Sequence, residues 1–368
     1  MNTVISSPKK YNHIMGIDIS DKKLNLCVLD SDGETVLEEV CPNTQADVVK
    51  LCAVYDCPSS VLIAMESGTH SPWLSHLFKS QGFDVLVGNP RKLRAIWTSK
   101  HKTDARDALM LARIARFDRN LLYPIKHRSL DAHKDLCVLK SRDNLVATRS
   151  RLVSSVRGQM KCFGLQLPTC SAESFHRKVR ELIPADLKAA MFPILDVLAK
   201  VGKEIKELDR HLSKLAQEKY PEAIKLQQIN GVGPVTAMAF VLTIEHSERF
   251  RSSRDVGPFL GLVPKKDSSG TVDKELSISK AGNKLVRRLL VGSAQYILGH
   301  FGKDCDLRRF GEKLAARGGA PRTAKRKAVV ATARKLAILM HTLWANDDDY
   351  IPFMIEHRRK RPQQAKAA

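Results

Sequence analysis

The chain has 368 residues, 43% of them apolar, and a formal net charge of +22 at pH 7. This length and apolar content suffice for two or three domains with packed cores. The sequence has neither an apolar run of the ~18–20 residues that span a membrane nor a signal-peptide h-region, so we expect a cytoplasmic protein without a membrane partner. The eight cysteines form no C-x-x-C pair, which favours reduced, mostly buried thiols over a zinc site.

The charge is unevenly distributed along the chain. Residues 1–90 carry 6 Lys and Arg against 11 Asp and Glu. Residues 91–161 carry 18 against 6, and residues 265–335 repeat those counts. Solvated charged faces usually mix the two signs, whereas these two blocks are strongly basic. They indicate polyanion-binding surfaces that serve an acidic N-terminal domain.

After a flexible leader at residues 1–12, the first predicted element is an apolar run, residues 14–20, that is interrupted by Asp18. Two further strand-like runs follow at residues 23–30 and 35–40, joined by a Ser-Asp-Gly turn. Burial of an isolated carboxylate is costly unless a cation or hydrogen-bond donors meet it. Asp18 is therefore either a metal ligand at the centre of a sheet, as in ribonuclease-H-like nucleases, or a strand-end residue that caps a turn.

The rest of the N-terminal domain alternates helices and strands. In chain order, the pattern predicts a helix at 44–55, a strand at 61–67, a helix from an N-cap at Ser71 to a stop at 81–82, and a strand at 84–89. The order β-β-β-α-β-α-β is that of a RuvC-like or ribonuclease-H-like α/β sheet. Asp18 then lies on the first strand and Glu66 at the end of the fourth.

A further predicted helix begins after Thr103 and carries Asp104 and Asp107 in its first turn. These two acids are three residues apart, so they project from one face. Acids in a first turn also complement the helix dipole, which is the simplest explanation for them. Together with Asp18 and Glu66 they supply four carboxylates, enough for one or two divalent ions. Because hard oxygen ligands favour Mg²⁺ or Mn²⁺, we predict a metal site formed by these four acids.

Two long helices are predicted next. The first, residues 130–163, has an apolar stripe and a basic face suited to phosphate groups. On this face, the candidate nucleic-acid contacts are Arg142, Arg149, Arg151, Arg157 and Lys161. The second helix, residues 187–220, has apolar residues at spacings of three and four, which is typical of a coiled coil. It either packs on its own domain or mediates self-association, and we favour self-association.

The C-terminal part is predicted to be mainly helical. A Gly-x-Gly hairpin at residues 229–234 opens a helix and can present backbone N–H groups to a phosphate. The Gly-Lys-Ser/Thr end of a P-loop is missing, so the hairpin indicates a small DNA-binding unit without sequence specificity rather than a nucleotide site. Residues 261–270 form a polar loop with a Ser-Ser-Gly triplet, which on its own is only a flexible loop.

A basic helix at residues 280–298 follows this loop. Its candidate nucleic-acid contacts are Lys280, Lys284, Arg287 and Arg288. We therefore expect an α/β catalytic domain, a helical connector with the coiled coil, and a mainly α-helical C-terminal domain. The predicted boundaries are a leader at 1–12, the catalytic domain at 13–128, the connector at 129–221, the C-terminal domain at 222–346 and a tail at 347–368.

Together, these residues resemble the DEDD transposases of bridge-RNA-guided insertion sequences, the family that includes the Piv site-specific invertase. Asp18 in GIDIS, Glu66 in MESGTHSPW, and Asp104 and Asp107 in KTDARDA match its four-acid RuvC-like motif. The stretches INGVGPVTA, GLVPKKDSSG and SKAGNKLVRRLL match its C-terminal transposase domain. The likeness covers nearly the whole chain.

The resemblance implies a nucleophile and a set of partners. A serine in the loop after the GL-x-P motif is the nucleophile of the family, and Ser269 falls at that position, with Ser268 beside it. This loop has Asp267 where the family often has an aromatic residue. The implied activity is RNA-guided DNA recombination through a phosphoserine intermediate, aided by Mg²⁺ at the four acids. The implied partners are target and donor DNA duplexes, a structured guide RNA and further copies of this chain, as a dimer or, on DNA, a tetramer.

Three other functions are compatible with parts of the sequence. A metal-dependent RuvC-like nuclease or junction resolvase would need no serine and would leave no protein–DNA adduct. An actin-like ATPase would share the GIDIS strand, but the sequence lacks a second phosphate loop and its charge of +22 argues against a nucleotide-binding role. A non-enzymatic nucleic-acid scaffold would tolerate the loss of all four acids.

Overall fold

A computed structural model of the chain describes residues 10–96, 103–269, 272–317 and 321–354. The chain divides into two compact units, Met1–His133 and Lys134–Ala368. Within the described ranges, no helix is long and apolar enough to cross a membrane. Most of the predicted leader and most of the predicted tail lie outside the described residues.

The N-terminal unit is built on a five-stranded mixed sheet with the order β3-β2-β1-β4-β5. Its strands are β1 (His13–Ile19), β2 (Lys23–Leu29), β3 (Thr35–Pro42), β4 (Val61–Glu66) and β5 (Asp84–Gly88). The first three pair antiparallel, whereas β4 runs parallel to β1 and β5 runs parallel to β4. The predicted α/β architecture of this unit is confirmed.

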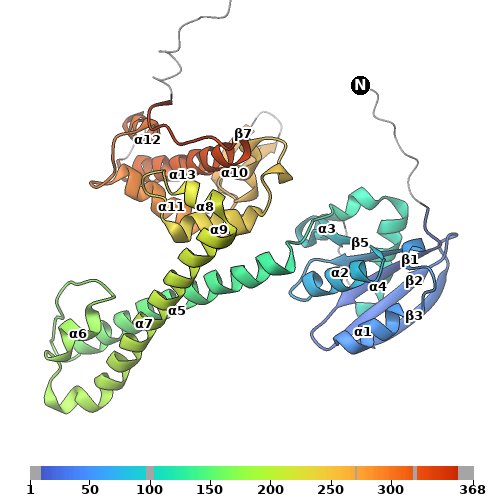
Figure 1. The fold of residues 1–368 in the computed structure, drawn as a ribbon, viewed down its shortest axis with the longest axis horizontal. Helices are drawn as coiled ribbons and strands as arrows, with labels where there is room; N and C mark the ends of the chain where they lie inside the picture. Colours follow the sequence, from blue (N-terminus) through green and yellow to red (C-terminus); the bar gives the residue numbers. More distant parts are fainter. Residues whose placement is uncertain (1–9, 97–102, 270–271, 318–320, 355–368) are drawn as a thin grey trace, which may run out of the picture. The chain divides into compact units, whose positions relative to one another are not determined.

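Helices cover both faces of this sheet (Figure 1). Side chains alternate between the faces of a strand, so β1 and β4 contribute to two separate cores. Met15, Ile17 and their neighbours on β4 pack with α1 (Gln45–Cys52) and α2 (Ser71–Ser80). On the opposite face of the sheet, Ile14 and the strand residues that alternate with Met15 and Ile17 pack with α4 (Asp104–Phe117). The sheet centre is therefore buried on both sides.

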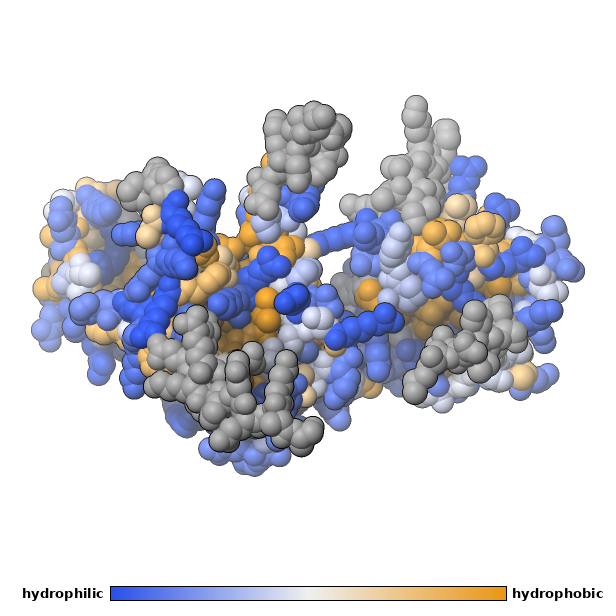
Figure 2. All heavy atoms as spheres, turned by 90° about the horizontal axis from the view of Figure 1, so that it is seen from above, coloured by the Kyte–Doolittle hydropathy of each residue, from blue (hydrophilic) through white to orange (hydrophobic). Residues whose placement is uncertain are grey.

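The second unit is mainly helical. Its long helices are α5 (Leu130–Lys161), which begins at the end of the first unit, α7 (Lys188–Lys219) and α13 (Pro321–Asn346). Shorter helices of this unit include α6 (Phe175–Arg180), α9 (Pro234–Ile244), α11 (Lys284–Leu298) and α12 (Asp306–Arg317). A two-stranded antiparallel ribbon, β6 (Pro264–Ser269) and β7 (Val272–Ile278), completes the unit. On the face shown in Figure 2, hydrophilic residues cover much of the surface, as expected for so highly charged a chain.

The helices α5 and α7 lie side by side and run antiparallel, with α6 near the far end of the pair (Figure 1). Arg142 of α5 pairs with Asp209 of α7 at 2.7 Å, while Met160 shares a core with Met191. The apolar stripe of α7 is buried within the protomer, at Leu195, Leu198, Val201, Ile205, Leu212 and Leu215. This stripe is therefore no longer an argument for self-association, which stays a prediction.

The structure corrects three local predictions. The predicted polar loop at 261–270 is instead largely strand β6 of the ribbon, which is held by backbone pairing with β7. The sequence of β6 has no apolar alternation from which a strand could be predicted. The basic helix begins at Lys284 rather than Lys280, because Lys280 has a left-handed φ of 53° and Asn283 caps the helix through the N–H groups of Leu285 and Val286. The helix α2 has His70 rather than Ser71 at its N-cap.

Candidate active site

Asp18 and Glu66 lie side by side at the ends of two neighbouring parallel strands. The register of β1 and β4 pairs Gly16 with Ala64 and Ile17 with Met65, so one further step places Asp18 beside Glu66. Both residues fall on the face of the sheet that α4 covers, because they follow the alternation of Gly16 and Ala64. Both are half-buried.

Gly16 allows α4 to approach β1 closely. A Cβ atom at this position would lie 1.9 Å from the carbonyl oxygen of Ala108 and 2.7 Å from the backbone nitrogen of Ala112. No side chain fits there, so the sequence Gly-Ile-Asp sets the distance between helix and sheet as well as the place of Asp18. The helix α4 itself begins as predicted, because the Thr103 side chain accepts a hydrogen bond from the N–H of Arg106.

The first turn of α4 lies at the same edge of the sheet as Asp18. Asp104 pairs through Oδ2 with Nζ of Lys23 at 3.2 Å, and Lys23 is the first residue of β2, opposite the end of β1. Asp104 is exposed, whereas Asp107, one turn further into the helix, is only 7% exposed. All four predicted acids are thus gathered at the edge where β1 and β4 end.

A buried amide that sequence reasoning missed belongs to this edge. Asn25 of β2 is paired with Asp18 of β1 and is 5% exposed. Its Nδ2 atom is buried without a hydrogen-bond partner among the described residues. A buried unsatisfied amide is costly, so it needs an explanation such as a ligand or ion at the site. The isolated Asn in the strand KLNLCVL was the signal in the sequence.

The four acids fit a hard divalent cation by their chemistry. All are carboxylates, the oxygen donors that Mg²⁺ and Mn²⁺ take, and a buried amide adjoins them. In the part of the chain that the structure describes, no group of three or more His, Cys, Asp or Glu side chains is close enough to hold a metal ion. The acids therefore share one edge of the sheet without forming a coordination shell, and Lys23 neutralises Asp104.

A network of serine and histidine follows Glu66, in the loop before α2 and the first turn of that helix. The Ser71 hydroxyl lies 2.9 Å from Nε2 of His127 and accepts a hydrogen bond from the N–H of Gly68. Burial, followed by the nearby His133 and His76, lowers the pKa of His127 to about 4. His127 is therefore neutral at physiological pH and ties this loop to the chain segment that precedes α5. Sequence reasoning missed the network, since its partners are far apart in the chain.

The predicted nucleophile lies on the ribbon of the second unit. Ser269 ends β6 and pairs with Val272 of β7, and Ser268 pairs with Asp273. The side chains of both serines, and of Asp267, lie outside the residues whose side chains the structure describes. The role of Ser269 therefore stays a prediction.

Several predicted nucleic-acid contacts hold the protein together instead of facing solvent freely. Arg157 donates to the carbonyl oxygens of Leu167 and Pro168 at 2.9 and 2.7 Å and stacks over Phe175. Arg287 donates to the carbonyls of Leu260 and Ala281.

The remaining candidates are paired, half-buried or exposed, and Arg288 is both paired and exposed. Arg142 pairs with Asp209, and Arg288 pairs with Asp143, while Arg149 is half-buried. The side chains exposed enough to meet a phosphate directly are Arg151, Lys161, Lys280, Lys284 and Arg288. The eight cysteines are free, as predicted, but only Cys27, Cys41, Cys52 and Cys305 are buried, whereas Cys57, Cys137 and Cys162 are exposed, so the expectation of mostly buried thiols holds for half of them.

Comparison with known proteins assigns the class. Residues 15–163, which include all four acids, match a family profile of DEDD transposases described as "Transposase". Residues 223–306, which include the ribbon and α11, match the profile described as "Transposase IS116/IS110/IS902 family". Both units of the chain thus match proteins of a single class, the transposases.

Individual relatives agree with this class along most of the chain. It is 25% identical over 344 residues to the "Transposase for insertion sequence element IS1111A" of Coxiella burnetii, covering 92% of this chain and 91% of the relative. It is 26% identical to the "Probable family 20 transposase" of Pseudomonas aeruginosa, covering 79% and 86%. It is 22% identical to the "Pilin gene-inverting protein" of Moraxella bovis, covering 78% and 81%. The chain belongs to the IS110/IS116/IS902 family of transposases.

Proposed function

We propose that this transposase is an RNA-guided DNA recombinase that breaks and rejoins strands through Ser269, with a divalent cation held by Asp18, Glu66, Asp104 and Asp107. The observation that carries the proposal is the gathering of four carboxylates at one edge of the sheet. Carboxylates that share one edge of the sheet repel one another, and a bound cation would offset their charge. Loss of the site should therefore abolish the reaction without unfolding the protein.

The N-terminal unit is proposed to be a RuvC-like domain. Three antiparallel strands followed by two parallel ones, in the order β3-β2-β1-β4-β5, support this assignment. So does the position of Asp18 on the central strand β1, next to Glu66 on β4. In such an arrangement the acids lie where a phosphodiester can reach them from the open edge.

The residues of the chain then have distinct parts in the reaction. A bound Mg²⁺ would stabilise negative charge on the phosphate oxygens. Asp18 and Glu66 are fixed by adjacent strands, and Asp107 is fixed by α4. These three carboxylates would hold the cation in place relative to the scissile bond. Asn25 lies opposite Asp18 in the register of β1 and β2. Asp104 pairs with Lys23 and would give up that pair in order to hold a cation.

Ser269 supplies the nucleophile in this proposal. Its hydroxyl oxygen forms a bond to the DNA phosphorus, the bond from phosphorus to a deoxyribose oxygen breaks, and the proton passes to that leaving oxygen. The phosphoserine ester conserves the energy of the broken bond, so a second sugar hydroxyl can reverse the step and join a new strand without an external energy source. Ser269 and the four acids belong to different units of the chain, so the proposed reaction has a composite site, as the family resemblance implies.

The partners of the proposed reaction are two DNA duplexes and a structured guide RNA. The net charge of +22 and the exposed cations Arg151, Lys161 and Lys284 support binding of polyanions. The protein would work as a dimer that becomes a tetramer on DNA, in the cytoplasm and on the nucleoid when active. Self-association would use surfaces other than the buried stripe of α7.

Co-purification tests this function. The protein is expressed with the non-coding DNA that flanks its gene, and the RNA that purifies with it is sequenced. That RNA, the protein and DNA bearing the matching junctions should yield recombinant product in Mg²⁺ and none in EDTA. Recombination that is undiminished after the RNA is digested would contradict RNA guidance, and activity that persists in EDTA would contradict the metal site.

A further inference from the structure

The ribbon that carries Ser269 is joined to the second unit at a root formed by two short segments. The chain enters β6 through residues 257–263 and leaves β7 through residues 279–283. In the ranges that the structure describes, neither strand pairs with a strand outside the ribbon. A two-stranded ribbon is only marginally stable by itself, so the position of its end depends on how the root is held.

The two segments of the root cross in direct backbone contact. Gly261 and Gly282 both have a left-handed φ, of +69° and +73°. A Cβ atom on Gly261 would collide with the carbonyl oxygen of Ala281, and one on Gly282 would collide with the carbonyl oxygen of Phe259. Each segment thus has a glycine at the point where it meets the other, because any side chain would separate them.

One side chain bonds both segments of the root. Arg287 of α11 is half-buried. Its Nη1 atom donates to the carbonyl oxygen of Leu260 at 2.9 Å, on the segment that enters the ribbon, and to that of Ala281 at 2.7 Å, on the segment that leaves it. The N–H of Lys280 adds a backbone bond to the carbonyl oxygen of Gly261 at 3.2 Å. Hydrogen bonds from a charged donor are stronger than those from a neutral one, so Arg287 is the main tie at the root.

The first turn of α11 is itself fixed to the core of the second unit. The Nδ2 atom of its N-cap, Asn283, donates to the hydroxyl oxygen of Thr243 in α9 at 3.2 Å, and Thr243 is fully buried. Val286 and Leu290 of α11 are also buried. Arg287 therefore connects a rigid part of the unit to the root of the ribbon.

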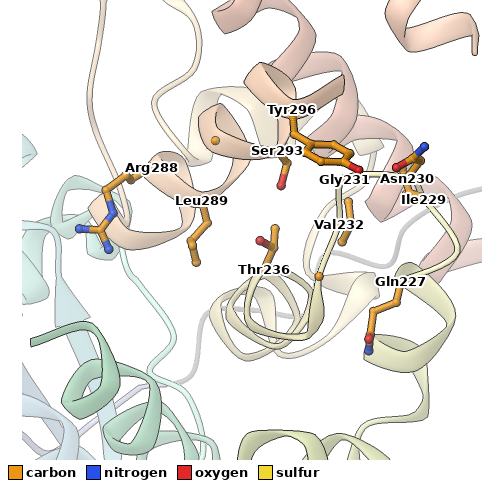
Figure 3. Close-up of a pocket in the computed structure, with 12 residues that line it drawn as sticks. Gln227, Ile229, Asn230, Gly231, Val232, Thr236, Arg288, Leu289, Ser293 and Tyr296 are labelled. Carbon is orange, nitrogen blue, oxygen red and sulfur yellow. The ribbon is translucent and has the colours of Figure 1, made fainter. Parts of the chain in front are cut away.

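The next arginine along the helix has different surroundings. Arg288 lines the pocket between α11 and the hairpin before α9 (Figure 3). It pairs with Asp143, and its side chain is 55% exposed. Successive side chains of a helix point about 100° apart, so two adjacent arginines can have unrelated roles. Arg288 is thus a matched control for Arg287.

We infer that Arg287 is a positioning residue, which orders the root of the ribbon and so holds Ser269 where its hydroxyl can reach the phosphodiester. The sequence predicted a nucleic-acid contact at Arg287, whereas its Nη1 donates both of its hydrogen bonds within the protein. A misplacement of about 1 Å can slow a reaction by about 100-fold, so a loosened root should slow the attack and leave DNA binding intact. The inference deepens the proposed function, on which it rests for the role of Ser269.

Hydrogen–deuterium exchange of the full chain tests the ordering of the root without DNA, RNA or cation. Arg287→Ala should speed exchange of the β6 and β7 amides by about tenfold or more, as loss of charged hydrogen bonds predicts, while α9 and α13 exchange as in the wild type. Arg288→Ala removes the same charge and should leave the ribbon amides unchanged. Arg287→Lys keeps the charge and loses the planar fork, so it should fall between Arg287→Ala and the wild type.

Three results of this measurement would overturn the inference. One is ribbon exchange that Arg287→Ala leaves unchanged, and another is an equal increase in Arg288→Ala. The third is faster exchange throughout the second unit together with a lower melting temperature, because Arg287 would then stabilise the whole unit and not the ribbon in particular. If Arg287→Ala does not fold, Arg287→Lys takes its place in the comparison.

The single-turnover rate of protein–DNA adduct formation tests the consequence for Ser269. The rate is measured with guide RNA and Mg²⁺ over a range of junction DNA concentrations. Arg287→Ala should lower the rate at saturating DNA by about 100-fold and leave the half-saturating concentration unchanged. Arg288→Ala should instead raise the half-saturating concentration. An unchanged saturated rate with a raised half-saturating concentration in Arg287→Ala would identify a nucleic-acid contact and overturn the inference.

The two measurements separate this inference from the proposed function. If the exchange results are as expected and the wild-type protein forms no adduct, the proposed function fails and the ordering of the ribbon by Arg287 stands. If the adduct forms through Ser269 and Arg287→Ala forms it at the wild-type rate, the proposed function stands and the inference fails.

Discussion

The two halves of the proposed site are built in very different ways. The four acids lie on a sheet buried on both faces, and their spacing is set by strand register and by the contact of Gly16 with α4. Ser269 ends one strand of a two-stranded ribbon that pairs with no other strand among the described residues. An isolated two-stranded ribbon is only marginally stable by itself.

This difference predicts which substitutions affect folding and which affect only the reaction. Substitutions at the acid edge affect chemistry through a rigid support, so they should act on the reaction and leave folding largely intact. Substitutions in the support of that edge should unfold the unit first. The ribbon, in contrast, contributes little to stability, so substitutions there should change the reaction rate and leave the stability of the protein nearly unchanged.

The largest effect is expected for Asp18→Asn. The amide keeps the shape of the carboxylate but not its charge, so strand cleavage should fall by about three orders of magnitude. The melting temperature should stay the same or rise, because one source of repulsion between acids is removed. The control is Glu34→Gln, an exposed acid elsewhere in the same unit. Cleavage by Asp18→Asn within twofold of the wild-type rate would contradict a catalytic role for the acids at this edge of the sheet.

The support of the acid edge is tested by Gly16→Ala. A methyl group would lie 1.9 Å from the carbonyl oxygen of Ala108, so α4 must shift. We expect a loss of about 3 kcal/mol in the free energy of unfolding, measured by urea denaturation, together with loss of cleavage. In α7, Gly202→Ala meets no atom and should instead stabilise by about 0.5–1 kcal/mol through helix propensity. Equal stability of both variants would mean that Gly16 does not set the position of α4.

The basic residues divide into structural and binding classes in the same way. Arg157→Ala removes two hydrogen bonds to carbonyl oxygens and a stacking contact, so it should destabilise by about 2 kcal/mol. Arg151→Ala, on the exposed face of the same helix, should change stability by less than about 0.5 kcal/mol but weaken RNA binding. Thermal melting and filter binding of both variants separate the two classes. The account fails if the exposed arginine is the more destabilising one.

Among stability effects, the smallest concerns pH. The pKa of His127 is about 4 in the folded protein against 6.5 in an unfolded chain, so the unfolded state takes up a proton first as pH falls. The stability that this neutral histidine contributes is complete above pH 6.5 and is lost progressively toward pH 4, by an amount on the order of 1–2 kcal/mol after solvent screening. His127→Gln should flatten this part of the curve of unfolding free energy against pH. An unchanged slope would show that other groups govern it.

Local signals in the sequence were enough for the strands of the N-terminal sheet and for the start of α4. The apolar runs around Asp18 and Glu66 predicted β1 and β4, and Thr103 predicted the start of α4, because caps and alternation act over a few residues. Neither signal shows that Asn25 adjoins Asp18, since that contact depends on register between strands. Nor could the tie between Ser71 and His127 be found, because its partners are 56 residues apart.

The helices and the ribbon also show that local sequence signals do not identify the packing partner of an element. The apolar spacing of α7 correctly predicted a helix with one buried face, but it did not show that this face packs against elements of the same chain, α5 and α6 among them. The ribbon was missed because β6 is almost entirely polar, although β7 carries an alternating pattern at Val272, Leu276 and Ile278 that Lys274 interrupts. The arginines were equally ambiguous in the sequence. Arg157 and Arg151 have the same charge, but Arg157 is bonded to backbone carbonyls whereas Arg151 is exposed.

The central claim is that Ser269 forms a covalent bond to DNA, and a denaturing gel tests it most directly. Labelled junction DNA is incubated with the protein, its RNA and Mg²⁺, then denatured and separated. The wild-type protein and Ser268→Ala should give a shifted band of DNA attached to protein, and Ser269→Ala should give neither that band nor recombinant product while still binding RNA and DNA. Free DNA ends without a shifted band, formed by Ser269→Ala at the wild-type rate, would contradict the account and identify a metal-dependent nuclease that uses water.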